Sequence, residues 1–212
     1  MSAITTKQTL PNVQRTIDRL IGEFDQIPLD RRVIIQQLTD FVARKSAAGE
    51  HVLLNFICTH NSRRSHIAQI WAQTAAHYFG IENVETFSGG TEATAFNPRA
   101  VKSMQDAGFN ITITKDGQNP TYEVRYSSES EALTVFSKKY DDDFNPRKDF
   151  AAIMTCSHAD ENCPLVNGAA TRIALTYNDP KDFDGTVQET AKYTERVHEI
   201  GREMLYAFSL LK

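Results

Sequence analysis

One short stretch constrains the fold of this chain more than any other: an apolar run followed by a cysteine, a polar loop and an arginine. The run spans residues 52–57 and ends at Cys58, six residues before Arg64. A buried strand that enters a tight loop and then a helix aims successive backbone N–H groups at one point, and the helix adds its positive N-terminal end. Such a turn can bind a tetrahedral oxyanion and favours the thiolate form of the cysteine.

This loop supplies both the attacking atom and the binding site for what it attacks. Arg64 can hold an oxyanion by two parallel hydrogen bonds, and Cys58 is the candidate nucleophile. An inert cysteine buried at a strand end is the alternative interpretation, and the surrounding strand, loop and helix disfavour it. We predict that the oxyanion is bound by the loop residues, which are Thr59, His60, Asn61, Ser62, Arg63, Arg64 and Ser65.

The pattern resembles the low-molecular-weight protein tyrosine phosphatase superfamily. The resemblance implies that Cys58 is the nucleophile, that Arg64 grips the oxyanion, that Ser65 hydrogen-bonds the thiolate and that Asn61 holds the shape of the loop. It also implies a general acid at an aspartate directly before a proline late in the chain, which matches Asp179. That carboxyl group would protonate the departing oxygen. An ordinary turn is the alternative reading of an isolated Asp-Pro pair.

The other two cysteines, Cys156 and Cys163, follow the apolar run 150–155. Their segment closely resembles the redox segment of the thioredoxin-coupled arsenate reductases, which share the phosphatase fold. The resemblance implies that Cys58 attacks arsenate, that Cys156 then attacks the Cys58 sulfur and releases arsenite, and that Cys163 moves the disulfide to Cys156–Cys163. Because the sulfurs must meet, we predict that segment 157–163 is mobile and partly unfolds on oxidation. Two incidental cysteines or a zinc site are the alternatives, and the spacing is not a close Cys-x-x-Cys pair.

Three positions depart from the family pattern. His60 stands where glycine is frequent, and Arg63 stands where a small residue or cysteine is common. Arg63 favours anion entry on one interpretation and is a solvated surface charge on the other. Gln69 stands where some reductases have a glutamate that helps to hold potassium. We therefore predict no required metal and no cofactor.

Three functions remain open from the sequence. The first is reduction of arsenate, with thioredoxin or a similar dithiol as the reductant. The second is a low-molecular-weight protein tyrosine phosphatase that hydrolyses phosphomonoesters through a phosphocysteine at Cys58. The loop after Asp179 lacks the paired tyrosines typical of phosphotyrosine-selective members, which lowers the weight of this reading. The third is a module that binds oxyanions without turnover.

Charge and cysteine usage limit the partners and the compartment. The formal net charge of −4 and the pI near 5.9 give no support for nucleic acid or an anionic membrane as a partner. The start of the chain lacks an apolar secretory segment, and no run approaches transmembrane length. Three cysteines fit a reducing compartment, so we expect a cytoplasmic protein.

From residue 51 onwards strands and helices alternate. Helices are expected near 66–79, 98–107 and 187–210, and strands near 84–88, after 107, and at 172–177. This order predicts an α/β fold with a parallel sheet and helices on both faces. The resemblance to the phosphatase superfamily implies a four-stranded sheet like that of phosphotyrosine phosphatase I. Within the unusual stretch 112–149, residues 122–126 and 133–136 predict an inserted β-hairpin.

Residues 1–50 are expected to form an N-terminal helical extension before a catalytic domain over 51–212. One helical face is marked by Val13, Ile17, Leu20 and Phe24, and another by Ile34, Leu38, Phe41 and Val42. Asp30 is the expected N-cap of the second helix. A helical hairpin packed on the core is one interpretation. A homodimer through these helices and a regulatory or partner-binding module are the others.

Overall fold

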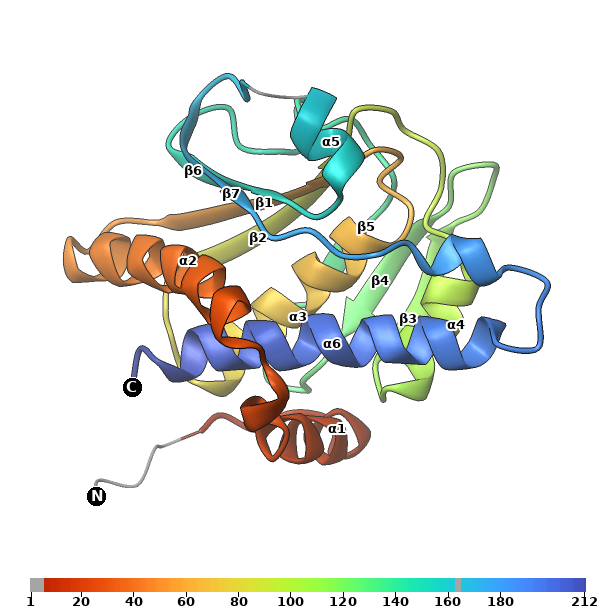
Figure 1. Cartoon of the computed structure of the whole chain (residues 1–212), viewed down its shortest axis with the longest axis horizontal. Helices are drawn as coiled ribbons and strands as arrows, with labels where there is room; N and C mark the ends of the chain where they lie inside the picture. Colours follow the sequence, from red (N-terminus) through yellow and green to blue (C-terminus); the bar gives the residue numbers. More distant parts are fainter. Residues whose placement is uncertain (1–5, 163–164) are drawn as a thin grey trace.

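The computed structural model describes residues 6–162 and 165–212, and its centre is one parallel sheet (Figure 1). Four strands lie in the order β2 (Val84–Gly90), β1 (Val52–Cys58), β6 (Phe150–Met154) and β7 (Ala169–Ala174), and each neighbouring pair is parallel. All of β1 except Leu53 is buried, as expected for a parallel strand that is covered on both faces. The predicted fold class is confirmed.

Helices cover both faces of this sheet, although unequally (Figure 1). Helices α2 (Leu29–Ala47), α3 (Arg64–Tyr78) and α6 (Glu189–Ser209) lie on one side, with α4 (Pro98–Asp106) beside α6. The short helix α5 (Ser157–Asn162) lies on the other side, against β1 and β6. Helices α3 and α6 approach closely because Gly201 has no side chain: an added Cβ would come within 2.6 Å of the Trp71 ring.

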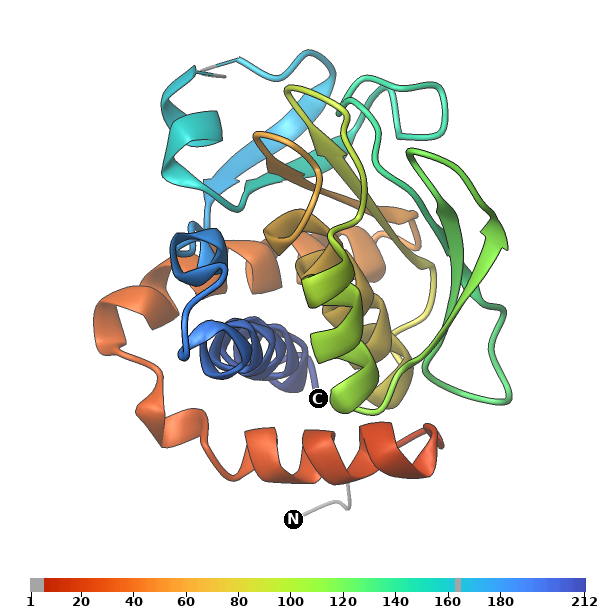
Figure 2. The same ribbon diagram turned by 90° about the vertical axis from the view of Figure 1, so that its right-hand side faces the viewer.

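The two N-terminal helices are present, but they do not stack on each other as a hairpin. Helix α1 (Pro11–Ile21), the short 3-10 turn η1 (Phe24–Gln26) and α2 pass around α6, and both helices pack on it (Figure 2). Most residues of the predicted apolar faces are buried, namely Val13, Ile17, Leu20, Leu38, Phe41 and Val42. Phe24 and Ile34 are only partly buried, and Phe24 lies in η1, beyond the end of α1. The expected N-cap at Asp30 is wrong, because α2 already begins at Leu29.

The inserted segment is larger than a hairpin. Strands β3 (Asn110–Lys115), β4 (Thr121–Arg125) and β5 (Leu133–Val135) form a separate antiparallel sheet in that order. The predicted pairing of residues 122–126 with 133–136 is confirmed. The strand after residue 107, expected in the alternating parallel sheet, instead pairs with β4. Only Ile111 of β3 is buried, which suits an exposed antiparallel ladder and not the interior of a parallel sheet.

Most other boundaries agree with the prediction. Asn97 caps α4 by accepting a hydrogen bond from the backbone N–H of Arg99. Strand β7 ends at Ala174, so residues 175–177, predicted as strand, lie beyond the sheet. In the described parts of the chain, no helix combines the length and the apolar character needed to cross a membrane.

The topology fixes where a ligand would bind. The chain leaves β1 for β2 on one side and returns later to β6 on the other side of β1. The carboxyl end of β1 is therefore a topological switch point, where open α/β sheets hold their ligands. The loop 59–63 and the end of β6 both lie at this edge.

Candidate active site

The loop 59–63 is held by backbone hydrogen bonds from the segment that follows β2. The N–H groups of Thr91, Glu92 and Asn97 donate to the carbonyls of Cys58, Thr59 and Ser62 at 3.1, 2.8 and 2.8 Å. These short bridges need a close approach, which the glycine at the end of β2 permits. A Cβ on Gly90 would lie 2.7 Å from both the Asn61 nitrogen and the Thr59 oxygen. The path of the loop is therefore set by its neighbours.

Asn61 is the residue that fixes the inside of the loop. Its φ of 43° lies in the left-handed region, which asparagine tolerates better than most residues. Its side chain is fully buried, donates to Ser65 Oγ at 2.9 Å and accepts from the backbone N–H of Lys138 at 2.8 Å. The inserted segment thus reaches the loop through Lys138, a contact that the sequence did not predict.

Cys58 and Ser65 face each other across the turn. Their Sγ and Oγ atoms are 3.1 Å apart, and both residues are buried. Ser65 lies in the first turn of α3, whose N-terminal end points at the same place. With Asn61 donating to the Ser65 oxygen, the Ser65 hydroxyl hydrogen is free to point at the sulfur. This geometry suits a serine that donates to a thiolate.

The outer side of the loop is formed by His60 and Ser62. The His60 carbonyl accepts from the Thr94 and Ser137 hydroxyls at 3.0 and 3.2 Å, and its ring is 44% exposed. The Ser62 hydroxyl donates to the Ala95 carbonyl at 2.8 Å. The His60 ring lies 3.8 Å from the Glu92 carboxylate, and the Ser62 hydroxyl is engaged with Ala95.

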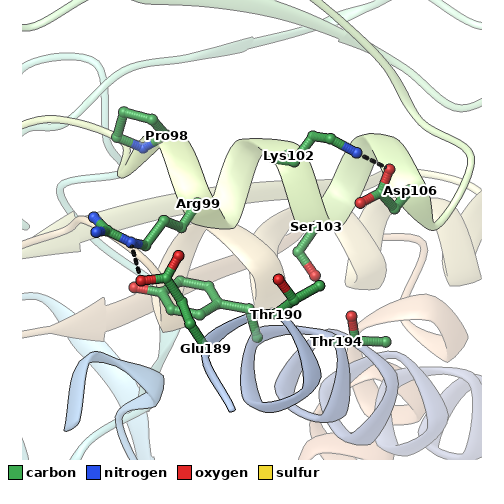
Figure 3. A pocket seen from close by; sticks show the side chains of 9 residues that line it. Pro98, Arg99, Lys102, Ser103, Asp106, Glu189, Thr190 and Thr194 are labelled. Atoms are coloured by element: carbon green, nitrogen blue, oxygen red, sulfur yellow. Dashed lines mark hydrogen bonds and ion pairs between the residues drawn. The ribbon is translucent and has the colours of Figure 1, made fainter. Parts of the chain in front are cut away.

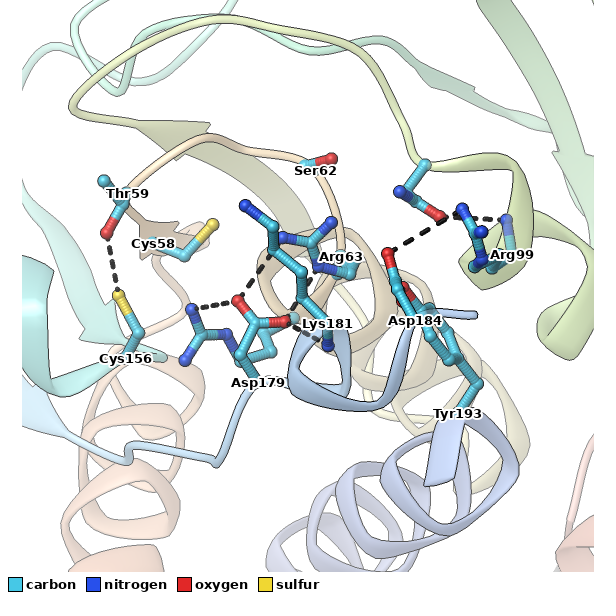
Figure 4. A network of polar contacts seen from close by, with 12 residues as sticks. Cys58, Thr59, Ser62, Arg63, Arg99, Cys156, Asp179, Lys181, Asp184 and Tyr193 are labelled. Atoms are coloured by element: carbon cyan, nitrogen blue, oxygen red, sulfur yellow. Dashed lines mark hydrogen bonds and ion pairs between the residues drawn. The ribbon is translucent and has the colours of Figure 1, made fainter. Parts of the chain in front are cut away.

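Two arginines meet one carboxylate at the mouth of the loop (Figure 4). Arg64 donates through Nη2 to Asp179 Oδ2 at 2.8 Å and through Nη1 to the Tyr177 carbonyl at 2.8 Å. Arg63 donates through Nε to Asp179 Oδ1 at 2.8 Å. The side chain of Arg63 is only 8% exposed, so it is not a solvated surface charge.

Burial alone would raise the pKa of Asp179, but the charges of Arg64 and Arg63 outweigh burial and hold the pKa below its ordinary value. The carboxyl group that the sequence places opposite Cys58 is therefore ionised at neutral pH in this structure. The backbone N–H of Lys181 also donates to the Asp179 carboxylate at 3.1 Å, which lowers the pKa of Asp179 further.

The second cysteine lies at the same mouth, on the other side of the loop. Cys156 follows β6, is buried, and lies 3.4 Å from the hydroxyl of Thr59, the residue after Cys58 (Figure 4). The Cys156 sulfur also accepts from the backbone N–H of Ala159 at 3.3 Å, at the start of α5. The Thr59 hydroxyl contacts His158 Nδ1 at 3.2 Å. The third predicted residue, Cys163, lies outside the described residues.

Two further polar side chains near the loop, His66 and Gln69, are packed inside the protein. His66 is fully buried, contacts the Ser88 hydroxyl at 3.0 Å and lies against the Phe96 ring. Burial holds the pKa of His66 well below its ordinary value. Gln69 donates to the Thr86 carbonyl at 2.9 Å. Among residues 6–162 and 165–212 there is no group of three or more His, Cys, Asp or Glu side chains that could hold a metal ion.

A second set of polar contacts lies beside a groove between α4 and α6. Asp184 accepts from the Tyr193 hydroxyl at 2.8 Å and pairs with Arg99 at 3.7 Å. Arg99 in turn pairs with Glu189 at 2.8 Å across a groove of about 250 Å³ between α4 and α6 (Figure 3). Sequence reasoning missed these residues because their partners come from distant segments.

The fold and the loop from Cys58 to Arg64 have the arrangement expected of a protein that binds a tetrahedral oxyanion. Residues 53–123 match the family described as low molecular weight phosphotyrosine protein phosphatase. The arsenate reductase of Bacillus subtilis is 30% identical over 156 residues, which are 73% of this chain and 94% of the relative. The arsenate reductase of Bacillus licheniformis is 32% identical over 152 residues, 70% of this chain and 89% of the relative. The chain therefore belongs to the low-molecular-weight protein tyrosine phosphatase superfamily, close to its arsenate reductases.

The chain is also similar to two solved structures, each with a TM-score below 0.5. A low molecular weight phosphotyrosine phosphatase from Vibrio cholerae superposes with a TM-score of 0.48 and 13% identity, over 74% of this chain and 94% of that one. A thioredoxin-dependent arsenate reductase from Corynebacterium glutamicum superposes with a TM-score of 0.42 and 19% identity, over 93% of this chain and 86% of that one.

Proposed function

We propose that this protein reduces arsenate to arsenite through a covalent adduct on Cys58 and a disulfide relay through Cys156 and Cys163. The observation that carries the proposal is the position of the second thiol. Cys156 is buried at the mouth of the oxyanion loop and shares the Thr59 hydroxyl at 3.4 Å. A phosphatase needs no second cysteine here, and the relatives named above are arsenate reductases.

The first step uses the loop alone. The thiolate of Cys58 attacks arsenic, the loop amides and Arg64 hold the arsenate oxygens, and one oxygen departs as water. Arg64 is anchored on the Tyr177 carbonyl through Nη1 at 2.8 Å, and the anion would take its Nη2 from Asp179, which accepts from it at 2.8 Å in this structure. Asp179, the general acid that the resemblance implies, faces the same mouth, but its pairing with Arg63 and Arg64 favours the ionised form of its carboxyl group.

The second step is a thiol–disulfide exchange. Cys156 attacks the sulfur of Cys58, the sulfur–arsenic bond breaks, and its electron pair remains on arsenic, which leaves as arsenite. Cys163 then attacks Cys156 and frees Cys58. An external dithiol such as thioredoxin reduces the Cys156–Cys163 disulfide and supplies the two electrons. We propose a cytoplasmic setting for the reaction, because all three thiols must start reduced. A homodimer through the N-terminal helices stays a prediction.

Phosphomonoester hydrolysis is the second candidate. The same loop would bind the phosphoryl group, Cys58 would form a phosphocysteine, and water would hydrolyse it. The family to which residues 53–123 belong favours this activity. The two reactions share their first step and differ in whether Cys156 takes part.

Replacing single cysteines separates the two candidates. We expect Cys156→Ser to abolish arsenite production while an aryl phosphate is still hydrolysed, and Cys58→Ser to abolish both. The measurement is arsenite release and aryl phosphate turnover by the same purified preparations. Ser157→Ala, which changes the exposed neighbour of Cys156, is the control and should keep both activities. Equal loss of both activities in Cys156→Ser would contradict the assignment.

A further inference from the structure

The carboxylate of Asp179 is enclosed by hydrogen-bond donors from two directions (Figure 4). Arg63 contacts both of its oxygens, at 2.8 and 3.4 Å, and Arg64 contacts one of them at 2.8 Å. The backbone N–H of Lys181 donates to the same oxygen as Arg63 Nε, at 3.1 Å. Each carboxylate oxygen therefore accepts a hydrogen bond from at least one guanidinium, a group that only donates and stays protonated.

The ion pairs lie largely out of water. The side chains of Arg63, Arg64 and Asp179 are 8%, 11% and 21% exposed. A charge pair that is screened so little is much stronger than a surface pair. Losing one guanidinium would therefore change the protonation of the carboxyl group more than the loss of an exposed arginine would.

The other charged groups around Asp179 do not replace Arg63. Asp184 and Tyr193 interact electrostatically with Arg63, and the pKa of Arg196 in α6 is lowered by burial and, to a smaller extent, by the charge of Arg64. Asp184 already bonds the Tyr193 hydroxyl and Arg99. None of these contacts brings another cation to the Asp179 oxygens.

The two arginines differ in what happens when substrate binds. Arg64 belongs to the oxyanion loop, so an arsenate or phosphate oxygen competes with Asp179 for its Nη2. Arg63 bonds Asp179 in bidentate fashion, and its guanidinium is committed to that carboxylate. When Arg64 binds the oxyanion instead of Asp179, Arg63 remains as the counter-ion of the Asp179 carboxylate.

We propose that Arg63 is a positioning residue that keeps Asp179 ionised in the substrate complex. It thereby restricts the site to substrates whose departing oxygen needs no proton from the protein. This inference rests on the proposed roles of Cys58 and Arg64 as nucleophile and oxyanion ligand. It names the substrate class of that same site: arsenate, and esters of acidic alcohols, in preference to esters of ordinary alcohols.

The proton balance gives the reason. When the thiolate attacks the arsenate monoanion, the sulfur–arsenic bond forms, one arsenic–oxygen bond breaks, and both hydrogens of the departing water come from arsenate. When it attacks a nitrophenyl phosphate, the oxygen leaves as a stable nitrophenolate. When it attacks the dianion of phenyl or alkyl phosphate, the leaving oxygen is a strong base and needs a donated proton. An Asp179 that is held ionised supplies that proton poorly.

The test compares leaving groups in one enzyme and its variants. We expect Arg63→Met to raise kcat/KM for phenyl phosphate relative to 4-nitrophenyl phosphate by about tenfold, a modest part of the 10²–10⁴ range of general acid catalysis. The region of acidic pH in which phenyl phosphate is hydrolysed should extend to higher pH, because loss of Arg63 raises the pKa of Asp179. Arg63→Lys should restore the parent ratio in part.

Arg99→Met is the matched control, since it removes a half-exposed arginine that does not touch Asp179. An unchanged leaving-group ratio in Arg63→Met, or the same rise in Arg99→Met, would overturn the inference. Folding of each variant is checked by circular dichroism, and Arg63→Gln takes the place of a variant that does not fold. Absence of turnover with every substrate in the parent protein is a different outcome, which would overturn the proposed function itself.

Discussion

At the scale of single residues, the oxyanion loop depends on Asn61 and on the main chain of Lys138. The amide of Asn61 joins the loop to Ser65 on one side and to the inserted segment on the other. The Lys138 ammonium has a different environment. It donates to the Phe136 carbonyl at 3.3 Å and lies 4.5 Å from the centre of the Phe136 ring, while the residue is 2% exposed.

Burial lowers the pKa of Lys138 to about 8 from its ordinary 10.5. The unfolded chain therefore holds this proton more tightly than the folded protein, and stability should rise as the pH rises from about 8 towards 10.5. We expect Lys138→Met to remove this pH dependence and to leave the free energy of unfolding at pH 7 unchanged or higher.

Urea unfolding at pH 7 and at pH 10 measures both effects. Protection of Cys58 from alkylation by phosphate should be kept in Lys138→Met, because the backbone N–H still bonds Asn61. A loss of more than about 2 kcal/mol at pH 7 would show that the ammonium stabilises the loop.

At the scale of elements, the features that depend on residues close together in the chain could be predicted from the sequence. The strand before Cys58, the capped helix after Asn97 and the long C-terminal helix depend on periodicity and on caps within a few residues, and they are confirmed. The partner of strand β3 depends on burial across the whole molecule, and a short strand carries no local signal that distinguishes a parallel ladder from an antiparallel one.

The same distinction applies to the site. The spacing from Cys58 to Arg64 is local, so the sequence predicted how the loop is built. The pairing of Arg63 with Asp179 joins residues 116 positions apart, and only the fold brings them together. The inserted segment reads as an appendage in the sequence. In the structure it contacts the loop through Ser137 and Lys138.

At the scale of the whole molecule, hydrogen bonds connect the N-terminal extension to Arg64, the residue that follows the loop 59–63. Arg31 of α2 holds Glu203 of α6 through two hydrogen bonds of 2.7 and 3.0 Å. Glu203 also accepts from the Tyr177 hydroxyl at 2.7 Å, and the Tyr177 carbonyl holds Arg64. The division at residue 50 into an extension and a catalytic domain stays a prediction, although residues from both parts share one buried core.

Replacing Arg31 tests this connection. We expect Arg31→Met to cost about 3–5 kcal/mol of stability, because the buried Glu203 carboxylate loses its cation. The double variant Arg31→Met/Glu203→Met should recover more than half of that loss. Chemical unfolding measures both, and Arg15→Met, at an exposed position of α1, is the control. A loss below about 1 kcal/mol in Arg31→Met would mean that the extension is not stabilised through this pair.

The central claim is that Cys58, in its oxyanion loop, passes the oxidising equivalents of arsenate to Cys156. The most direct measurement treats reduced Cys163→Ser protein with arsenate and no external reductant, then maps disulfides by mass spectrometry and counts arsenite. We predict one arsenite per protein and a trapped Cys58–Cys156 disulfide, both suppressed by excess phosphate. Free thiols at both positions with no arsenite, in a protein whose aryl phosphatase activity is intact, would contradict the account.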